Sequence, residues 1–303
     1  MIATAERVVG PTGAELAVYR TGDPAKPTVV LVHGFPDDHT AWEGVAARLA
    51  GEHHVVTYDV RGTGASSRPS RIADYAVDLL AADLQAVIDH VDDGRGVHLV
   101  GHDWGSVQGW HLITDPTHHG VLSYTSISGP CLDHVPGWIA RQGRAGRWRD
   151  IAALWKSPLY MGLLSVPVLA PLLCRSGMVD ATIAAAAKLV ERPEAQRPEP
   201  AGPSARRNAA SVRMYAANLL PRLRHGDHGG TDVSVQVLTP ARDVFIPPVS
   251  QGDPHLDIAT VTIREVPGGH WAPTYNPRAV AAPIAGWIAQ HHDHATAGPA
   301  LTR

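Results

Sequence analysis

The chain contains 303 residues and carries a formal net charge of −3 at pH 7. It is longer than the roughly 150 residues of a typical domain, yet its length fits one large α/β domain with an insertion. Charges of both signs are dispersed along it, which excludes a strongly basic face for nucleic acid and a polybasic segment for a membrane surface. We therefore expect a small-molecule partner and a protein that is a monomer or a homodimer.

The sequence holds two cysteines, Cys131 and Cys174. They are too few for a disulfide framework and show no zinc-site spacing, so a reducing cytoplasm is the expected location. The N-terminal segment MIATAERVVGPTGAE has no basic region followed by an apolar one, and no run reaches the ~18 apolar residues of a membrane span. We expect neither a leader peptide nor contact with a membrane.

Strand-like and helix-like patterns alternate through the first part of the chain. Short β-branched apolar runs, typical of strands buried on both faces, occupy residues 27–34, 53–60, 96–103 and 121–128. Between them, residues 75–91 carry apolar side chains at a spacing close to 3.6, which predicts a helix. This alternation predicts an α/β fold with a mostly parallel sheet flanked by helices.

The strand pattern stops near Pro130 and returns only at residue 232. The intervening segment has an apolar stretch interrupted by Pro167 and Pro171 and a Pro-rich connector, ERPEAQRPEPAGPSARR, and it predicts an inserted helical cap. Two more strands, a closing helix and a frayed tail are predicted at residues 232–240, 259–267, 277–290 and 291–303. The expected divisions are a first core segment, a cap and a second core segment, at residues 1–132, 133–230 and 231–303.

The segment HLVGHDWGSVQGW, residues 98–110, has the pattern of a strand, a sharp turn and a helix. Gly101 and Gly105 leave room for a strained turn that lifts the middle side chain above the sheet, so Asp103 is a candidate nucleophile. The backbone N–H of Trp104 is a candidate donor to an oxyanion, because it lies at the start of the helix. An aspartate before a helix is also commonly only an N-cap, so the segment alone leaves both roles open.

Three further motifs follow predicted strands. HGFP at residues 33–36 offers the Phe35 N–H as a second oxyanion donor. Asp243 in RDVFIPP and His270 in GGHW follow the last two strands. Competing aspartates lie before the strand or farther along the loop, whereas His270 is one of 18 histidines and is distinguished only by its glycine-flanked loop. The order of nucleophile, acid and histidine is the one expected for the α/β-hydrolase fold.

Together, the motifs HGFPD, GHDWG, RDVFIPP and GHW resemble those of α/β-hydrolase-type epoxide hydrolases, and the resemblance covers most of the chain, from VLVHGFPDD to GGHWAPTYNP. The sequence is also similar to the hydrolase portion of actinobacterial proteins that join such a domain to a short-chain dehydrogenase. No Gly-x-Gly-x-x-Gly motif of the dehydrogenase portion occurs, so we expect that portion to be absent here. Further residues within these motifs are expected in the substrate pocket: His33, Pro36, His102 and Trp271.

The resemblance implies two cap tyrosines that hold and protonate an epoxide oxygen. Tyr160 in LYMGLLSVP and Tyr215 in VRMYAANLLPRL match these positions. Ala216 stands where the family usually has arginine, and Ser106 stands where it commonly has glycine, departures that concern the substrate more than the chemistry. A tyrosine in an apolar helix is otherwise more often a packing residue with its hydroxyl at the rim.

The chemistry that the resemblance implies has two steps. Asp103 attacks an epoxide carbon and forms an alkyl-enzyme ester, while Tyr160 and Tyr215 donate to the departing oxygen. His270, oriented by Asp243, then activates a water that hydrolyses the ester and releases a vicinal diol. No metal or organic cofactor is needed. The apolar cap run YMGLLSVPVLAPLLC is compatible with a hydrophobic epoxide, although such runs commonly pack a cap onto its core.

Two other interpretations stay open. A haloalkane or haloacetate dehalogenase uses the same aspartate, acid and histidine to displace halide, but haloalkane dehalogenases commonly have asparagine where Phe35 stands, and the haloacetate type usually has arginine where Trp104 stands. The chain could instead be a non-catalytic binder, because a fold alone does not determine function. The intact set of Asp103, Asp243 and His270 argues against that interpretation.

Overall fold

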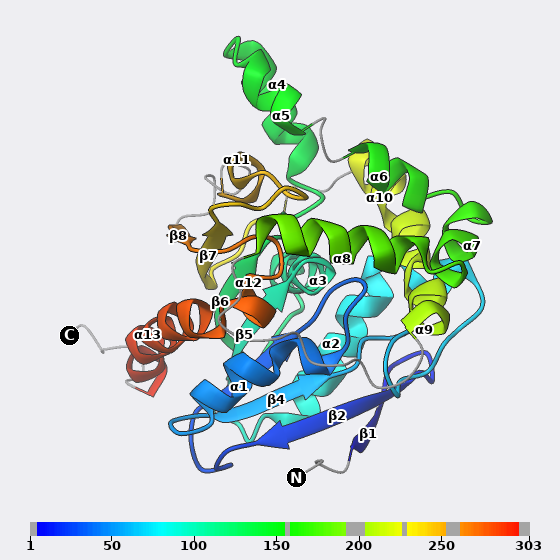
Figure 1. Cartoon of the computed structure of the whole chain (residues 1–303). Coiled ribbons are helices and arrows are strands. Elements are labelled where there is room, and N and C mark those ends of the chain that lie inside the picture. Colours follow the sequence, from blue (N-terminus) through cyan, green and yellow to red (C-terminus); the bar gives the residue numbers. More distant parts are fainter. Residues whose placement is uncertain (1–4, 155–157, 192–203, 226–228, 253–260, 297–303) are drawn as a thin grey trace.

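The computed structural model describes residues 5–154, 158–191, 204–225, 229–252 and 261–296, and an eight-stranded sheet forms its centre (Figure 1). The strand order is β1-β2-β4-β3-β5-β6-β7-β8, in which β2 runs antiparallel to both neighbours and the remaining pairs are parallel. The strands are Glu6–Val9 (β1), Glu15–Thr21 (β2), Thr28–Val32 (β3), His54–Tyr58 (β4), Val97–His102 (β5), Val121–Ile127 (β6), Ser234–Pro240 (β7) and Val261–Val266 (β8).

Helices cover both faces of the sheet. Alternate residues of a strand point to opposite faces, so Val29 and Leu31 of β3 belong to the apolar cluster under α1 and α13, whereas Val30 and Val32 belong to the cluster under α2 and α3. The two clusters bury both faces of the central strands, as a parallel sheet requires. The flanking helices are Glu43–Leu49 (α1), Val77–Val91 (α2), Trp104–Thr114 (α3) and Pro277–Thr296 (α13).

Cap helices lie between β6 and β7 in the chain; the first two project away from the sheet, and the later ones cover the edge where the parallel strands end (Figure 1). They are Val135–Arg144 (α4), Trp148–Leu154 (α5), Pro158–Leu164 (α6), Leu169–Arg175 (α7), Met178–Val190 (α8), Ser204–Ser211 (α9) and Arg213–His225 (α10). Short helices complete the connections: His39–Trp42 (η1), Ile72–Tyr75 (η2), Pro248–Gly252 (α11) and Ala272–Tyr275 (α12). Ligands of open α/β sheets bind at this same edge.

The predicted fold class is confirmed, and two local differences have physical reasons. The hairpin β1–β2 was not predicted, because β1 has only four residues and exposes three of them. The predicted tail is wrong for residues 291–296, since α13 continues to Thr296 and the His291 side chain bonds the carbonyl of Trp287 at 2.8 Å. Pro167 separates α6 from α7, and Pro171 lies in the first turn of α7, where a proline is tolerated.

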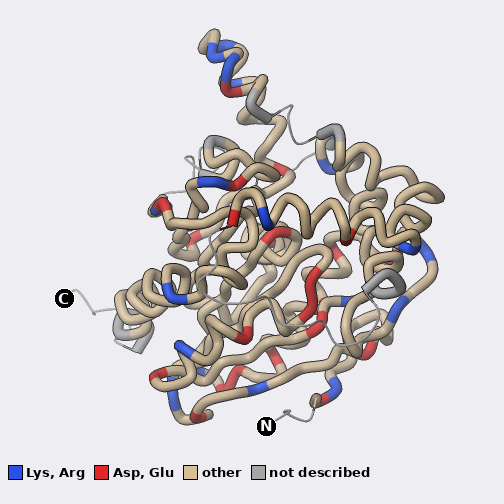
Figure 2. Tube along the Cα trace, in the orientation of Figure 1, with Lys and Arg blue, Asp and Glu red and all other residues tan. Residues whose placement is uncertain are grey.

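Lysine, arginine, aspartate and glutamate are scattered over the chain in the view of Figure 2, as the sequence indicated. Over the described residues, no individual helix combines the length and the apolar character that a membrane crossing requires. The adjacent helices α7 and α8 have that length and apolar character only when taken together, and the chain bends by 70° between them.

Candidate active site

Asp103 lies on the sharp turn between β5 and α3. Its backbone has φ 54° and ψ −121°, a conformation that non-glycine residues rarely adopt. The turn needs small neighbours: a Cβ on Gly105 would lie 2.2 Å from the carbonyl oxygen of Val32, and one on Gly101 would lie 2.5 Å from that of Gly105. The strained turn thus presents Asp103 above the carboxyl end of a central strand.

Ser106 fixes this turn from beneath. Its hydroxyl is fully buried and donates to the carbonyl oxygen of Gly129 at 2.6 Å, and it lies 2.6 Å from the hydroxyl of Ser126 on β6. A Cβ on Gly129 would lie 2.3 Å from the carbonyl oxygen of Asp103, so β6 and the turn are in close contact. The serine that replaces a commoner glycine therefore joins α3 to β6 and does not face the cavities.

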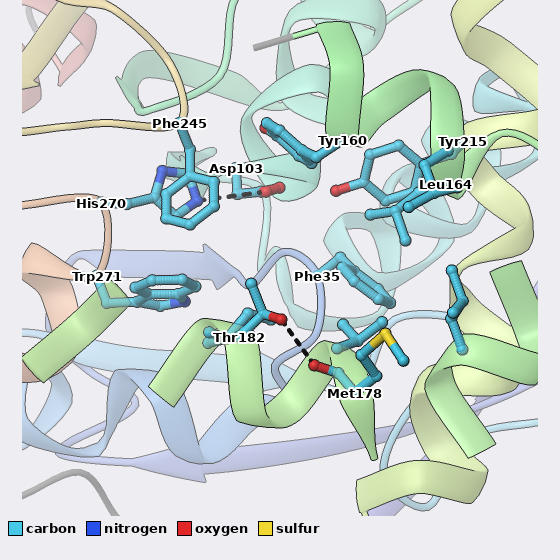
Figure 3. A pocket seen from close by; sticks show the side chains of 14 residues that line it. Phe35, Asp103, Tyr160, Leu164, Met178, Thr182, Tyr215, Phe245, His270 and Trp271 are labelled. Carbon is cyan, nitrogen blue, oxygen red and sulfur yellow. Dashed lines mark hydrogen bonds and ion pairs between the residues drawn. The ribbon is translucent and has the colours of Figure 1, made fainter. Parts of the chain in front are cut away.

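His270 lies between Asp103 and Asp243, as Figure 3 shows for the first of these contacts. Its Nε2 is 3.6 Å from Oδ1 of Asp103, and its Nδ1 is 3.1 Å from Oδ2 of Asp243. The Asp243 carboxylate also accepts the backbone N–H groups of Phe245 and Ile246, both at 2.9 Å. Segments after β5, β7 and β8 thus bring the three predicted residues together.

The charges of Asp103, Asp243 and His270 shift the pKa values of His270 and Asp243. Burial would lower the pKa of His270, but the carboxylates of Asp243 and Asp103 outweigh burial and raise that pKa to about 10. Burial would likewise raise the pKa of Asp243, but His270 and the hydrogen bonds that the carboxylate accepts lower it below the usual value. In the resting state His270 is therefore an imidazolium between two carboxylates.

The two predicted oxyanion donors border Asp103. The Trp104 N–H already donates to Oδ2 of Asp103 at 2.6 Å. Gly34, which precedes Phe35, lies so close that a Cβ there would be 2.4 Å from the Cβ of Asp103. The Trp104 backbone before α3 and the Gly34 backbone after β3 therefore both lie against Asp103, and the donor role of the Phe35 N–H stays a prediction.

Two cavities meet at Asp103, Tyr160 and Tyr215, beneath the cap. The smaller, of about 140 Å³, is walled by aromatic and aliphatic side chains including Phe35, Leu164, Met178, Ile183, Phe245, His270 and Trp271. The larger, of about 310 Å³, extends along α3, α4 and α10 and is lined mainly by Val107, Pro130, Leu132, Val135, Ile139, Ile151, Met161, Leu219, Leu223 and Ile246. Both interiors are mostly apolar, so Asp103 and the two tyrosines are the polar groups where they join.

The tyrosines approach Asp103 from two cap helices. Figure 3 shows the hydroxyls of Tyr160 on α6 and Tyr215 on α10 directed toward the space beside the Asp103 carboxylate. Burial, together with the Asp103 charge, raises the pKa of Tyr215 well above its usual value, and burial with the neighbouring Tyr215 and Asp103 does the same for Tyr160. Both hydroxyls therefore stay protonated at neutral pH and can donate hydrogen bonds.

The four residues predicted in the substrate pocket separate into two groups. Trp271 lines the smaller cavity. Of the described residues that line either cavity, none is His33, Pro36 or His102. His33 accepts the Val60 N–H at 3.0 Å and holds the loop after β3, and the buried His102 donates from Nε2 to the carbonyl oxygen of His270 at 2.7 Å. Their side chains support the backbone of the site instead of contacting its interior.

One neighbour of the acid was missed from the sequence. Gln251 of α11 donates from Nε2 to Oδ2 of Asp243 at 3.2 Å and to the carbonyl oxygen of Ile246 at 2.7 Å. No motif places a contact eight residues after the acid, so the sequence alone could not have identified Gln251. In the described part of the chain, no group of three histidine, cysteine or acidic side chains is arranged to hold a metal ion.

Comparison with known proteins identifies relatives that are similar in sequence. A mycobacterial protein named "Probable oxidoreductase EphD", from Mycobacterium tuberculosis, is 36% identical over 286 residues, which are 91% of this chain and 48% of the relative. Epoxide hydrolase A of the same organism is 39% identical over 151 residues, 48% of this chain and 46% of that protein. The chain thus spans about half the length of the curated relatives it matches most extensively.

Solved structures share the fold at lower identity. An epoxide hydrolase from Vigna radiata superposes with a TM-score of 0.70 at 21% identity, covering 95% of this chain and 98% of that one. A Bacillus megaterium epoxide hydrolase gives 0.66 at 18% identity over 94% and 100% of the two chains. The sequence profile of the alpha/beta hydrolase fold family matches residues 27–202. The resemblance to epoxide hydrolases of this type is confirmed, and the chain belongs to the alpha/beta hydrolase fold family.

Proposed function

We propose that the chain is an epoxide hydrolase that opens an apolar epoxide to a vicinal diol through a covalent Asp103 ester. The observation that carries the proposal is the pair of protonated cap tyrosines, Tyr160 and Tyr215, facing a carboxylate nucleophile across the cavities. A carboxylate attacks carbon, and a nearby acid is what a departing alkoxide requires. The names of the epoxide hydrolase relatives support the same substrate class.

In the first step, Asp103 attacks one epoxide carbon, the carbon–oxygen bond breaks, and a tyrosine proton passes to the alkoxide. The nucleophile is held by the strained turn, so no rearrangement is needed before attack. The epoxide oxygen then lies between Tyr160 and Tyr215, while its apolar substituents occupy the two cavities.

In the second step, His270 removes a proton from a water that attacks the Asp103 ester carbonyl. Formation of the ester removes the Asp103 charge, one of the causes that raise the His270 pKa, so the pKa of the imidazolium falls. The imidazolium proton then replaces, through solvent, the proton that the tyrosine gave up in the first step, which leaves His270 neutral for the attack of water. The oxyanion forms beside the Trp104 N–H, which already bonds the Asp103 carboxylate. Loss of one such donor typically costs ~2.7–4 kcal/mol of transition-state stabilisation.

A single turnover in ¹⁸O-water tests the covalent step, with excess enzyme and one equivalent of styrene oxide. The attacking oxygen comes from Asp103, so the diol of the first turnover should contain ¹⁶O and the enzyme should acquire the label. Direct appearance of ¹⁸O in that first diol would show that water attacks the epoxide itself.

A second experiment separates epoxide opening from dehalogenation. Replacing both Tyr160 and Tyr215 by Phe should abolish diol formation while a haloalkane, if it were the substrate, would still release halide. Tyr19→Phe on β2, which removes a hydroxyl bonded to Asp59 away from the cavities, serves as the control. Halide release by the wild-type chain that survives the double replacement would support the dehalogenase instead.

A further inference from the structure

Glu191 is a buried carboxylate at the C-terminal end of cap helix α8. Its side chain is 7% exposed, and its Oε2 accepts the backbone N–H of Gly269 while its Oε1 accepts that of Trp271, both at 2.9 Å. These two amides belong to the residues on either side of His270. A cap side chain therefore holds the backbone that carries the predicted base.

The same short segment is held from the opposite direction. The carbonyl oxygen of His270 accepts a hydrogen bond from His102 Nε2 at 2.7 Å. A Cβ on Gly269 would lie 2.7 Å from Oε1 of Glu191, so glycine is what lets the carboxylate approach. Three consecutive residues, Gly269 to Trp271, thus each have one backbone group fixed by a side chain from the cap or from the end of β5.

Charge explains why a carboxylate suits this position. Hydrogen bonds from backbone N–H to a carboxylate are roughly twice as strong as those to a neutral acceptor, and each Glu191 oxygen accepts one. Both oxygens of Glu191 are engaged, and among the described residues that line the two cavities Glu191 does not occur. Any effect of Glu191 on the reaction therefore passes through the backbone of residues 269–271 that it holds.

We propose that Glu191 is a positioning residue that fixes His270 for hydrolysis of the covalent ester. The inference rests on the proposed function, because ester hydrolysis is the step that uses His270 as a base. Helix α8 also supplies Met178, Thr182 and Ile183 to the smaller cavity, so a helix that lines this cavity also ends on the His270 loop. The cap and the base are thereby joined through one side chain.

The variants are Glu191→Ala, Glu191→Gln and Arg242→Ala. Arg242 donates from Nε to the carbonyl oxygen of Val190 at 3.0 Å, so its truncation removes a side-chain contact at the same end of α8 while Glu191 keeps its hydrogen bonds to the amides beside His270. Glu191→Gln keeps the shape and one acceptor oxygen, which preserves a test if Glu191→Ala fails to fold.

Ester formation and ester hydrolysis are measured separately by rapid mixing with styrene oxide and intact-protein mass spectrometry. In Glu191→Ala hydrolysis should slow by about 10-fold or more, since misplacing a reacting group by 1 Å can cost ~100-fold, and the ester should accumulate. Ester formation should stay within about two-fold of wild type, Glu191→Gln should lie between, and Arg242→Ala should resemble wild type. Equal slowing of both steps, or the same effect in Arg242→Ala, would overturn the proposal.

A substrate-free measurement distinguishes this inference from the proposed function. NMR of the His270 ring N–H reports its hydrogen bond to Asp243, and that signal should broaden or shift in Glu191→Ala but persist in Arg242→Ala. If wild-type protein forms no ester with any epoxide, the proposed function fails while the NMR result still decides whether Glu191 positions His270. An unchanged His270 signal in folded Glu191→Ala would refute the positioning role.

Discussion

The nucleophile shows what a short stretch of sequence can predict at the scale of a residue. Two glycines around Asp103 predicted a strained turn, and the positive φ of Asp103 is the strain that they permit. The order of Asp103, Asp243 and His270 predicted their convergence, because each follows a strand that ends at the same edge. The supporting roles of His102 and Glu191 could not be predicted, since both side chains bond backbone groups, which every sequence carries.

Gly34→Ala should displace the Asp103 carboxylate without removing any polar group. The added Cβ would lie 2.4 Å from the Cβ and 2.8 Å from the Cγ of Asp103, so the carboxylate has to move. Overpacking of this kind typically costs ~1–3 kcal/mol of stability. We expect ester formation to slow by about 100-fold, as for a ~1 Å misplacement, while the protein stays folded. Gly51→Ala, where a Cβ meets nothing within 4 Å, is the control for stopped-flow kinetics and thermal unfolding.

The ionisation of His270 makes stability depend on pH. Its pKa is raised from the usual 6.5 to about 10, so the resulting stabilisation is complete below pH 6.5 and is lost as the pH rises through 10. Each pKa unit corresponds to about 1.4 kcal/mol. Urea unfolding at pH 6.5 and pH 9.5 should therefore show a larger loss of unfolding free energy in wild type than in His270→Gln. Equal losses in both proteins would contradict the imidazolium assignment.

At the scale of elements, the cap is attached to the core through α10. Asn218 accepts the Val77 N–H at 2.7 Å with Oδ1, and its Nδ2 donates to the carbonyl oxygens of Tyr75 and Met214 at 2.8 and 2.9 Å. The first turn of α2 thus obtains a hydrogen-bond acceptor from the cap, which its own N-cap residue, Ala76, does not supply. Tyr215 lies on the same helix, one turn before Asn218.

Asn218→Ala should therefore affect both stability and catalysis. The buried Val77 N–H would lose its acceptor, which typically costs ~1–3 kcal/mol. The change removes one of the contacts that hold α10 to α2, so we expect kcat for epoxide opening to fall because Tyr215 is less well placed. Asn218→Asp retains an acceptor for Val77 but loses the donor to Tyr75, and it should be intermediate in denaturant unfolding and in kcat. Full activity in Asn218→Ala would show that other contacts hold Tyr215.

The pattern of apolar residues predicted the buried helices and strands and missed those that are short or half-exposed. The central strands were predicted from continuous β-branched apolar runs, and α2 from apolar residues that repeat with a period close to 3.6. The hairpin β1–β2 pairs along one edge and exposes much of β1, so its pattern is weak. In the cap, Pro167 predicted an interruption, but how α6 and α10 orient their tyrosines depends on packing between helices and could not be derived from spacing.

At the scale of the whole molecule, the site exists only where the two parts of the chain meet. Asp103, Asp243 and His270 come from the core, whereas Tyr160 and Tyr215 come from the cap. The strand-end motifs predicted the places of Asp103, Asp243 and His270. The two tyrosines came from the resemblance to a known family. The two cavities could not be predicted, because their shapes follow from how apolar residues far apart in the chain pack between the cap and the sheet.

The shape of the larger cavity predicts a preference for the length of the epoxide substituent, which side chains of α10 determine. Tyr215, Leu219 and Leu223 are spaced by four residues, lie on one face of the helix and line this cavity, so Leu223 is about 12 Å along the axis from Tyr215. Leu223→Trp should fill the distal part of the cavity and raise KM for epoxydodecane by about 10-fold or more, a difference of ~1.4 kcal/mol, while leaving epoxybutane nearly unchanged.

The matched control for this preference is Leu220→Trp. Leu220 lies on the same helix, its side chain is 56% exposed, and it is not among the described residues that line the larger cavity. A tryptophan there adds the same bulk to α10 without entering the cavity, so KM for both epoxides should stay at the wild-type value. If both variants shift KM for epoxydodecane equally, the long substituent does not occupy the larger cavity. A selective effect of Leu223→Trp would instead place that substituent along α10, with the epoxide oxygen at Tyr215.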